Sequence, residues 1–426
     1  MADSTGKAEY FVGLDLGGTK ILAGVFKHSL ECIGTAKLST KSQRGVEPVI
    51  ERVARCVQDA VDEADLTLKQ IAAVGIGAPG AVDFAEGRVI FAPNMEGWKD
   101  VPLKKALEKQ LGVPVFVEND GNIAALGVHV AELKAKPKHL IGIFVGTGIG
   151  GGIIINGELY SGFNHTAGEI GHMVLDINGP KCGCGNKGCF EALASRTAIF
   201  QQIKAGVKDG QKTLLTEMLG ADLSDLRSGD LRKAIRRGDK FVDKVVEGAA
   251  EYIGIGIATL VNVLGPEVVV LGGGVMEALA DEMMSVIIET ANDYAMPGTM
   301  KGVEIVASKL GDNAGITGGA VLARRESKKT PRPVLPAARR GEPKAGRGGN
   351  PKPEIRNPKG SSRAHALRVT GFAFPSRFTF HVSRPTLRFR ISDFGFRLSD
   401  PPSDACPPWR EGQPANPPAD KNVQCR

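Results

Sequence analysis

Two stretches of the chain share one plan, in which an apolar strand leads through a glycine-rich turn into a second apolar strand. The first stretch, YFVGLDLGGTKILAGVF, begins at residue 10, and the second, LIGIFVGTGIGGGIIINGELY, begins at residue 140. Runs of Val, Ile and Phe on both sides of a turn favour paired strands over a helix. Two copies of one unit predict two similar domains that face each other across a cleft.

Around these stretches, strand-like and helix-like segments alternate as far as residue 326. Strand-like runs include 10–16, 21–26, 71–76, 113–117, 139–145, 152–155 and 267–271, and helix-like runs include 46–64, 103–111, 121–133, 192–205 and 241–264. This alternation indicates an α/β protein. We expect an N-terminal domain over residues 1–120 and a second domain over residues 121–326, whose last helix packs back on the first.

Residues 327–426 differ in composition from the rest. They hold 20 of the 54 Lys and Arg and 7 of the 47 Asp and Glu, a net charge of 20 − 7 = +13, which leaves 34 − 40 = −6 for the first 326 residues. Sixteen of the 25 prolines also lie here. This composition predicts a disordered basic C-terminal tail, with a small β-hairpin module or a membrane or nucleic-acid arm as alternatives. The mildly acidic body argues against a nucleic-acid partner.

The sequence carries no membrane signal. Its longest apolar stretch, Ile253–Leu264, is too short to span a bilayer, and residues 1–10 lack the apolar segment of a secretory signal. We therefore expect a cytoplasmic protein with no membrane partner. In that compartment, cysteines are more often thiols or metal ligands than disulfides.

Three glycine-rich turns follow predicted strands, at Asp15–Lys20, Gly146–Gly152 and Gly272–Gly274. Glycine lets backbone N–H groups approach a phosphate closely, so three such turns in one chain predict a phosphate site. The dinucleotide motif G-x-G-x-x-G needs a helix directly after the loop, whereas the match at 146–151 runs into an apolar strand. No P-loop motif G-x-x-x-x-G-K-[S/T] occurs.

A phosphate loop between antiparallel strands resembles the arrangement in actin/hexokinase-like ATPases, whose domains are ribonuclease-H-like. The resemblance implies that one hairpin turn from each domain grips the phosphates of ATP, through Gly17, Gly18, Thr19 and Lys20 in the first turn and Gly146, Thr147 and Gly148 in the second. It also implies that Asp15 holds Mg²⁺ and that Gly272 and Gly273 lie along the adenosine.

A cluster of candidate metal ligands follows the second turn. His172, Cys182, Cys184 and Cys189 fall within one stretch, with Gly and Asn residues between the cysteines. Three thiolates and one imidazole suit a closed tetrahedral zinc site; packed thiols or a redox C-x-C pair are the alternatives. A zinc ion with four protein ligands has no open position for water, so its expected role is structural. It would hold a loop that carries Glu169, His172 and Glu191.

An acidic segment, Glu118-Asn119-Asp120, follows the predicted strand 113–117. Carboxylates at the C-terminal ends of strands in α/β folds face the ligand crevice. Asp120 is therefore either the N-cap of helix 121–133 or a general base that takes the proton of an attacking hydroxyl during phosphoryl transfer. The neighbouring Asn119 can donate to a sugar hydroxyl.

Six motifs together resemble the ROK family of repressors, open reading frames and sugar kinases, and its bacterial ATP-dependent glucokinases in particular. They are DLGGTK at 15–20, GIGAPGAVD at 75–83, PNMEGW at 93–98, VENDGNIAALG at 117–127, VGTGIGGG at 145–152 and GEIGHMVLDINGPKCGCGNKGCFEALASR at 168–196. The resemblance covers residues 10–325. It implies two hexokinase-like domains, a homodimer or homotetramer, and ATP-dependent phosphorylation of a hexose, expected to be glucose, at O6.

The same resemblance assigns the sugar site. The residues that match the family's sugar-binding positions are Gly80, Asn94, Asn119, Asp120, Glu169, His172 and Glu191, with Asp120 also the catalytic base. Two features depart from the family pattern. Gly121 stands where the family often has Ala, which we expect to be a mild change, and the basic tail has no counterpart.

Three functions fit these observations. A hexose kinase, a glucokinase above all, is expected first. Within this class, N-acetylmannosamine kinase, fructokinase and allose kinase are the alternatives, and polyphosphate is the alternative to ATP as donor. A sugar-responsive repressor of the same family is disfavoured, because such repressors carry a helix-turn-helix domain before the first phosphate loop and about ten residues precede it here. A non-catalytic sugar- or nucleotide-binding protein is disfavoured by the intact Asp15 and Asp120.

Overall fold

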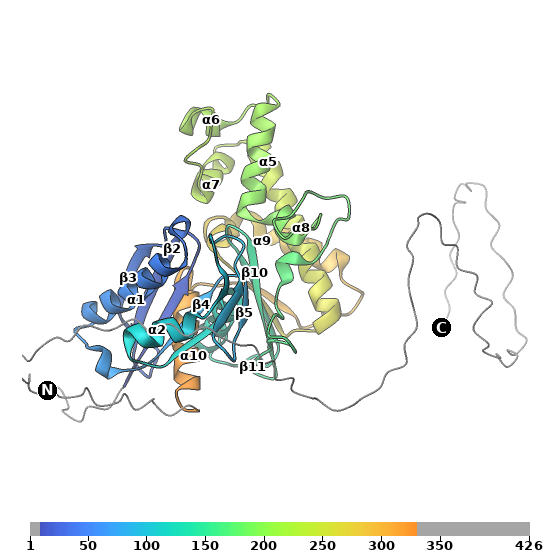
Figure 1. Ribbon diagram of the computed structural model, residues 1–426. Helices are drawn as coiled ribbons and strands as arrows, with labels where there is room; N and C mark the ends of the chain where they lie inside the picture. The colour runs from blue at the N-terminus through green and yellow to red at the C-terminus, as the bar shows by residue number, and fades with distance from the viewer. Residues whose placement is uncertain (1–8, 330–426) are drawn as a thin grey trace, which may run out of the picture. The chain divides into compact units, whose positions relative to one another are not determined.

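The structure, a computed structural model, describes residues 9–329, so the predicted tail lies outside it except for its first three residues. Two five-stranded sheets form its framework (Figure 1). The first has the order β3-β2-β1-β4-β8 and the second the order β11-β10-β9-β12-β13. Each begins with an antiparallel hairpin and continues through parallel strands, so the two repeated stretches of sequence occupy equivalent places in the two sheets.

The strands are short and mostly apolar. Those of the first sheet are β1 (Tyr10–Leu16), β2 (Lys20–Phe26), β3 (Cys32–Ser39), β4 (Ile71–Ala78) and β8 (Val115–Asn119). Those of the second are β9 (Leu140–Val145), β10 (Ile149–Ile155), β11 (Glu158–Leu159), β12 (Val268–Gly272) and β13 (Glu304–Ala307). A small sheet contains β5 (Ala81–Asp83), β6 (Arg88–Phe91) and β7 (Lys99–Val101). The α/β prediction is confirmed.

Helices cover both sheets. They are α1 (Val46–Glu63), α2 (Leu103–Leu111), α3 (Asp120–Gly127), α4 (Phe190–Ala194), α5 (Arg196–Lys208), α6 (Leu214–Leu219), α7 (Ser228–Arg236), α8 (Lys240–Leu264), α9 (Gly274–Tyr294) and α10 (Asn313–Glu326). In α1, buried Val residues recur every fourth position, at 49, 53, 57 and 61, and form one apolar stripe. That stripe packs α1 against β2 and β3 in the core of the first sheet.

The last helix lies very close to the first sheet. A Cβ atom added at Gly13 in β1 would come within 1.7 Å of the Ile316 carbonyl oxygen, and one added at Gly75 in β4 within 2.0 Å of the Gly319 oxygen. Glycine in the middle of both strands therefore lets the backbone of α10 approach the sheet. α10 packs on β1, β4 and α3, as expected for a last helix that returns to the first domain.

Helix α3 contacts both sheets, through β4 and β8 of the first and β9 and β10 of the second. At its start, a Cβ atom on Gly121 would come within 2.5 Å of the Gly151 carbonyl oxygen in β10. The expectation that Gly121 is a mild departure from the family's Ala was wrong for this chain, because alanine requires α3 and β10 to move apart.

Two predicted helices are not single α-helices over their whole expected length. The predicted helix 192–205 is two helices, because Ser195 has an extended backbone and its side chain accepts a hydrogen bond from Ala198 N as the N-cap of α5. The predicted helix 121–133 is α-helical only to Gly127 and continues as a π-helix over Val128–Glu132. The helices α6 and α7 were not predicted.

Helix α8 is long and apolar enough to cross a membrane by length and composition alone. However, 56% of its most apolar window is buried inside the protein. It packs against α4, α5 and α9, so its position is that of a core helix.

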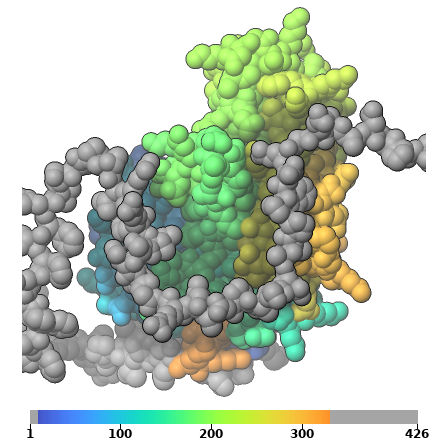
Figure 2. Space-filling model, turned by 90° about the vertical axis from the view of Figure 1, so that its right-hand side faces the viewer, coloured from blue at the N-terminus to red at the C-terminus, as the bar shows by residue number. Residues whose placement is uncertain are grey.

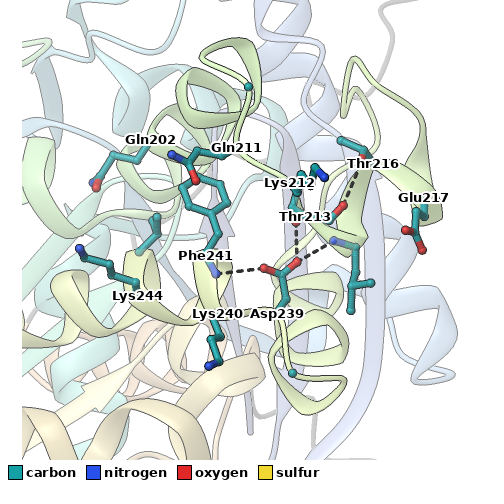
Figure 3. A pocket seen from close by; sticks show the side chains of 14 residues that line it. Gln202, Gln211, Lys212, Thr213, Thr216, Glu217, Asp239, Lys240, Phe241 and Lys244 are labelled. Atoms are coloured by element: carbon teal, nitrogen blue, oxygen red, sulfur yellow. Dashed lines mark hydrogen bonds between the residues drawn. The ribbon is translucent and has the colours of Figure 1, made fainter.

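Helices α5, α6 and α7 form a lobe that projects from the body in both views (Figures 1 and 2). A buried carboxylate, Asp239, joins this lobe to the start of α8 (Figure 3). One of its oxygens accepts hydrogen bonds from Phe241 N and Val242 N, and the other accepts from the Thr213 hydroxyl at 2.6 Å and from Leu214 N at 2.7 Å. Asp239 is thus an N-cap shared between two segments.

Replacing Asp239 with Ala is expected to lower the free energy of unfolding by about 2 kcal/mol or more. The change removes the cap of α8 and leaves the buried Thr213 hydroxyl and Leu214 N–H without their partner. Urea denaturation measures the loss. Asp243→Ala, at an exposed position in the first turn of the same helix, is the matched control. Equal stability of the two variants would contradict the shared-cap role.

Candidate active site

Three polar residues meet at one edge of the first sheet. β1, β4 and β8 are parallel neighbours, with Asp15 in register with Gly77 and Ala78 in register with Asn119. Asp15 lies near the end of β1, Asn119 ends β8, and Asp120 is the first residue of α3. The carboxyl ends of these strands therefore bring Asp15, Asn119 and Asp120 together, as the ligand-crevice argument predicts.

Both aspartates have a raised pKa. Burial raises the pKa of Asp120 to about 7, and the negative charges of Asp15 and Glu169 add to the effect. Burial also raises the pKa of Asp15 to about 6, opposed by the positive charge of Lys20. A carboxyl group with a pKa near neutrality can accept and release a proton at physiological pH, which is the property a general base needs.

The N-cap of α3 is Asn119 and not Asp120, for which the cap was the first alternative. Asn119 is the N-cap of α3, and its side-chain oxygen accepts from Asn122 N at 3.1 Å. Its amide nitrogen donates to the Gly80 carbonyl oxygen at 3.0 Å. Gly80 has a φ of +79° and no room for a Cβ atom, since Phe91 O would lie 2.2 Å away. Asp120 is therefore not needed as the cap.

Residues from other parts of the chain contact the first predicted phosphate turn and hold it in place. The Thr40 hydroxyl donates to the Gly17 carbonyl oxygen at 2.6 Å, and Thr40 N donates to Thr19 O at 2.8 Å. Lys20 pairs with Asp312 at 2.5 Å, next to the start of α10. Gly18 lies against Asn94, whose carbonyl oxygen would be 3.5 Å from a Cβ at Gly18. This places the predicted sugar residue Asn94 beside the predicted phosphate turn.

The second phosphate turn joins β9 to β10 and is closed by a hydrogen bond from Gly146 N to Gly148 O at 2.8 Å. Gly273, with a φ of +87°, packs on this hairpin, because a Cβ there would come within 2.6 Å of Val145 O. The predicted adenosine residues Gly272 and Gly273 therefore lie next to the turn that contains Gly146, Thr147 and Gly148.

The predicted zinc ligands lie together. The ligand atoms of His172, Cys182, Cys184 and Cys189 all fall within 4.8 Å of one another. His172 Nδ1 is 3.7 Å from Cys182 Sγ, and the sulfur atoms of Cys184 and Cys189 are 3.6 Å apart. Ligands at zinc–sulfur distances of about 2.3 Å in a tetrahedron are about 3.8 Å apart. The four residues therefore fit a tetrahedral zinc ion.

His172 also faces residues that the family resemblance predicts to bind the sugar. Its Nε2 atom is 3.9 Å from Glu169 Oε2, on the opposite side of the ring from the cysteines. Burial raises the pKa of Glu169, the charge of His172 lowers it, and the charge of Glu191 raises it, so these three groups are neighbours. Glu191 also accepts from Ile149 N at 2.9 Å, which links it to the start of β10.

Some residues at the site were missed in the sequence. Buried Glu118 accepts from Asn119 N at 2.8 Å and from the Asn122 side chain at 3.1 Å, and so supports the strand end that carries the site. Thr40 and Asp312 hold the first phosphate turn. Only Glu118 had a usable signal, its position next to Asn119.

Two cavities border the lobe. One of about 1230 Å³ lies around Gln202, Thr213, Asp239 and Phe241, and no predicted site residue lines it (Figure 3). The other, of about 590 Å³, is lined by Thr147 of the second phosphate turn. The second cavity therefore adjoins the candidate active site, and the first does not.

Each of the two sheets begins with a hairpin that contains a glycine-rich turn, and Asp15 and Asp120 lie at strand ends of the first sheet. This arrangement defines an actin/hexokinase-like α/β protein. The ROK family pattern matches residues 11–326, and the chain belongs to the ROK family.

Similar proteins include a kinase and a repressor known by sequence and a kinase of known structure. A glucokinase of Thermotoga maritima is 34% identical over 314 residues, which are 74% of this chain and 96% of that protein. A putative xylose repressor of Caldicellulosiruptor sp. is 33% identical over 308 residues, 72% of this chain and 76% of that protein. A solved ROK family glucokinase from Streptomyces griseus, in complex with glucose and AMPPNP, has a TM-score of 0.66 and 32% identity over 74% of this chain and 99% of that one.

Proposed function

We propose that the protein is a sugar kinase that transfers the γ-phosphoryl group of ATP to O6 of a hexose, with glucose as the preferred substrate. The observation that carries this proposal is the placement of Asp120. Its half-buried carboxyl group has a pKa raised to about 7, and it lies close enough to both Asp15 and Glu169 for their negative charges to raise that pKa. We assign Asp15 to the phosphate side and Glu169 to the sugar side. A base at this place can take the hydroxyl proton as the new O–P bond forms.

The sugar would be held by polar groups from both halves of the chain, Asn94, Asn119 and Asp120 from the first and Glu169, His172 and Glu191 from the second. Carboxylates, an amide and an imidazole are the groups that bind several hydroxyls of one ring and fix its orientation. We infer a boundary between residues 120 and 121, at the start of α3, because α3 contacts both sheets. The homo-oligomeric state stays a prediction.

The donor would lie along the two glycine-rich turns, where backbone N–H groups can face its phosphates. Asp15 is a carboxylate with Lys20 and Asp312 nearby, and it fits an Mg²⁺ ion bound with the phosphates. When bound, Mg²⁺ neutralises charge on the transferred group. The Cys₃His cluster fits a zinc ion that holds the segment from His172 to Cys189.

A coupled assay across hexoses and donors tests the proposal. We expect ATP-dependent phosphorylation with the highest kcat/KM for glucose, above mannose, fructose, allose and N-acetylmannosamine. Identification of the product as a 6-phosphate checks the position. Sugar binding without turnover on any hexose and with any donor would contradict the kinase proposal and favour a role like that named for the repressor relative.

A further inference from the structure

The larger of the two cavities, of about 1230 Å³, has no part in the proposed reaction (Figure 3). Its walls come from α5, from the segment before α6, from α6 and from the start of α8. None of the residues predicted to bind sugar, ATP, magnesium or zinc lines it. Small-molecule sites measure about 300–1,000 Å³, so this cavity has room for a ligand of its own.

Three lysines line this cavity, Lys212 before α6 and Lys240 and Lys244 in the first turns of α8. All three are exposed, and none forms an ion pair among residues 9–329. Lys240 and Lys244 are four residues apart, so they lie on the same side of α8 and their charges repel each other. They also lie at the N-terminal end of a 25-residue helix, where the helix dipole is unfavourable for positive charge. An anion bound beside these two lysines relieves both effects.

The carboxylates of the cavity do not neutralise these lysines. Asp239 is buried, and its two oxygens accept four hydrogen bonds from the starts of α6 and α8. Glu217 is exposed on α6 and lies on the opposite side of the view from Lys244 (Figure 3). The nearby acidic residues of α8, Asp243 and Glu247, do not line the cavity. The α8 side of the cavity therefore carries positive charge, which favours an anionic ligand.

Two other side chains fit a ligand that has hydroxyl groups and a hydrocarbon part. The amide of Gln211 forms no hydrogen bond with the other described residues, and it can both donate to and accept from a hydroxyl. The half-buried ring of Phe241 packs on Gly206 of α5, where an added Cβ atom would come within 2.2 Å of the ring. This contact fixes the ring as an apolar wall. An apolar wall with a few polar groups beside it is typical of a small-molecule site.

We propose that this cavity is a second ligand site, which binds a small phosphate ester that carries hydroxyl groups. Lys240 and Lys244 bind the phosphate through their ammonium groups, and Lys212 adds positive charge. Gln211 binds a hydroxyl, and the carbon skeleton packs on Phe241. The hexose 6-phosphate expected as the product of the reaction has this chemistry, and so do smaller esters such as glycerol 3-phosphate. The site does not depend on the proposed kinase function.

Calorimetry without ATP tests the proposal with three probes, glucose 6-phosphate, glycerol 3-phosphate and inorganic phosphate. We expect at least one ester to bind more tightly than inorganic phosphate, because only an ester offers hydroxyls to Gln211 and carbon atoms to Phe241. A double variant, Lys240→Gln with Lys244→Gln, is expected to bind that ester at least about tenfold more weakly. Its melting temperature without ligand should be equal or higher, since two unfavourable charges leave the start of α8.

The matched control is a second double variant, Lys109→Gln with Lys136→Gln. Both of these lysines are exposed, form no ion pair among the described residues and lie outside the cavity, so the loss of net charge is the same and the affinity should not change. Selective binding of glucose 6-phosphate would identify the ligand as the product, whereas equal binding of glycerol 3-phosphate would show that any small phosphate ester is accepted.

Three results would overturn the proposal. The first is that neither ester binds the wild-type protein at millimolar concentration. The second is that inorganic phosphate binds as tightly as both esters, which would indicate a simple anion site. The third is that saturating glucose abolishes ester binding while the variant of Lys240 and Lys244 leaves it unchanged, because the ester would then occupy the candidate active site. None of these measurements requires turnover, so a failure of the kinase proposal is recognised separately.

Discussion

Replacing Asp120 with Asn is expected to lower kcat for hexose phosphorylation by at least about a hundredfold, because general-base catalysis contributes about 10²–10⁴ in rate. The asparagine side chain keeps the size of the carboxylate, and its oxygen can still accept the 2.8 Å hydrogen bond from Gly121 N. It cannot accept the proton of the attacking hydroxyl. The KM for the sugar should change much less, since Glu169, His172 and Glu191 remain.

Steady-state kinetics with glucose and ATP measures this effect. Asp100→Asn is the matched control, because Asp100 is an exposed carboxylate that pairs with Arg88 on the small sheet, outside the candidate site. A circular-dichroism melt shows whether Asp120→Asn is folded. Near-normal turnover of a folded Asp120→Asn variant would mean that the base is elsewhere or that the reaction is a different one.

The pH dependence of the wild-type protein provides a second check on Asp120. The base must be ionised, so kcat/KM for the hexose should fall as the pH drops below about 7, the pKa of Asp120 in the free protein. The carboxyl groups that face it, Asp15 and Glu169, both raise this pKa. For stability the sign is opposite. A raised carboxyl pKa favours the folded state below the ordinary value of 3.8, and this contribution is lost as the pH rises through about 7.

The parts of the site that could be predicted are those whose chemistry lies within a short stretch of sequence. Cys182, Cys184 and Cys189 indicated a metal site because their spacing and the glycines between them are local features, and the structure brings them together with His172. The two glycine turns were predictable for the same reason. Their apolar flanks specify hairpins, which both sheets contain.

The parts that could not be predicted depend on contacts between distant segments. Nothing near Lys20 indicates that it pairs with Asp312, or that Thr40 closes the first phosphate turn. The glycines of α10 look unfavourable for a helix when read alone. They make sense only beside Gly13 and Gly75, where the backbones of helix and sheet nearly touch. Likewise, Arg196 is the last residue of the motif at 168–196, but its contact with Thr147 can be recognised only from the folded structure.

The zinc site supports the second large prediction. Cys184→Ser is expected to remove most of the bound metal, from about one zinc ion per chain, and to lower kinase activity by at least about tenfold. The physical reason is that two of the zinc ligands lie next to residues that we propose bind the sugar. His172 faces both Cys182 and Glu169, and Cys189 directly precedes α4, which carries Glu191. Loss of the metal is therefore expected to free residues that we propose bind the sugar, on both sides of the cluster.

Metal analysis of the purified protein, together with the coupled assay, measures both effects of Cys184→Ser. Cys32→Ser is the matched control, since Cys32 is likewise an exposed thiol but lies on β3, away from the cluster. The contact of Glu191 with Ile149 N adds a finer expectation. Because this bond reaches the start of β10, loss of zinc should weaken ATP binding as well as sugar binding. If only sugar binding is weakened, the phosphate turn keeps its position without the metal. Fully active protein that contains no zinc would contradict the structural role altogether.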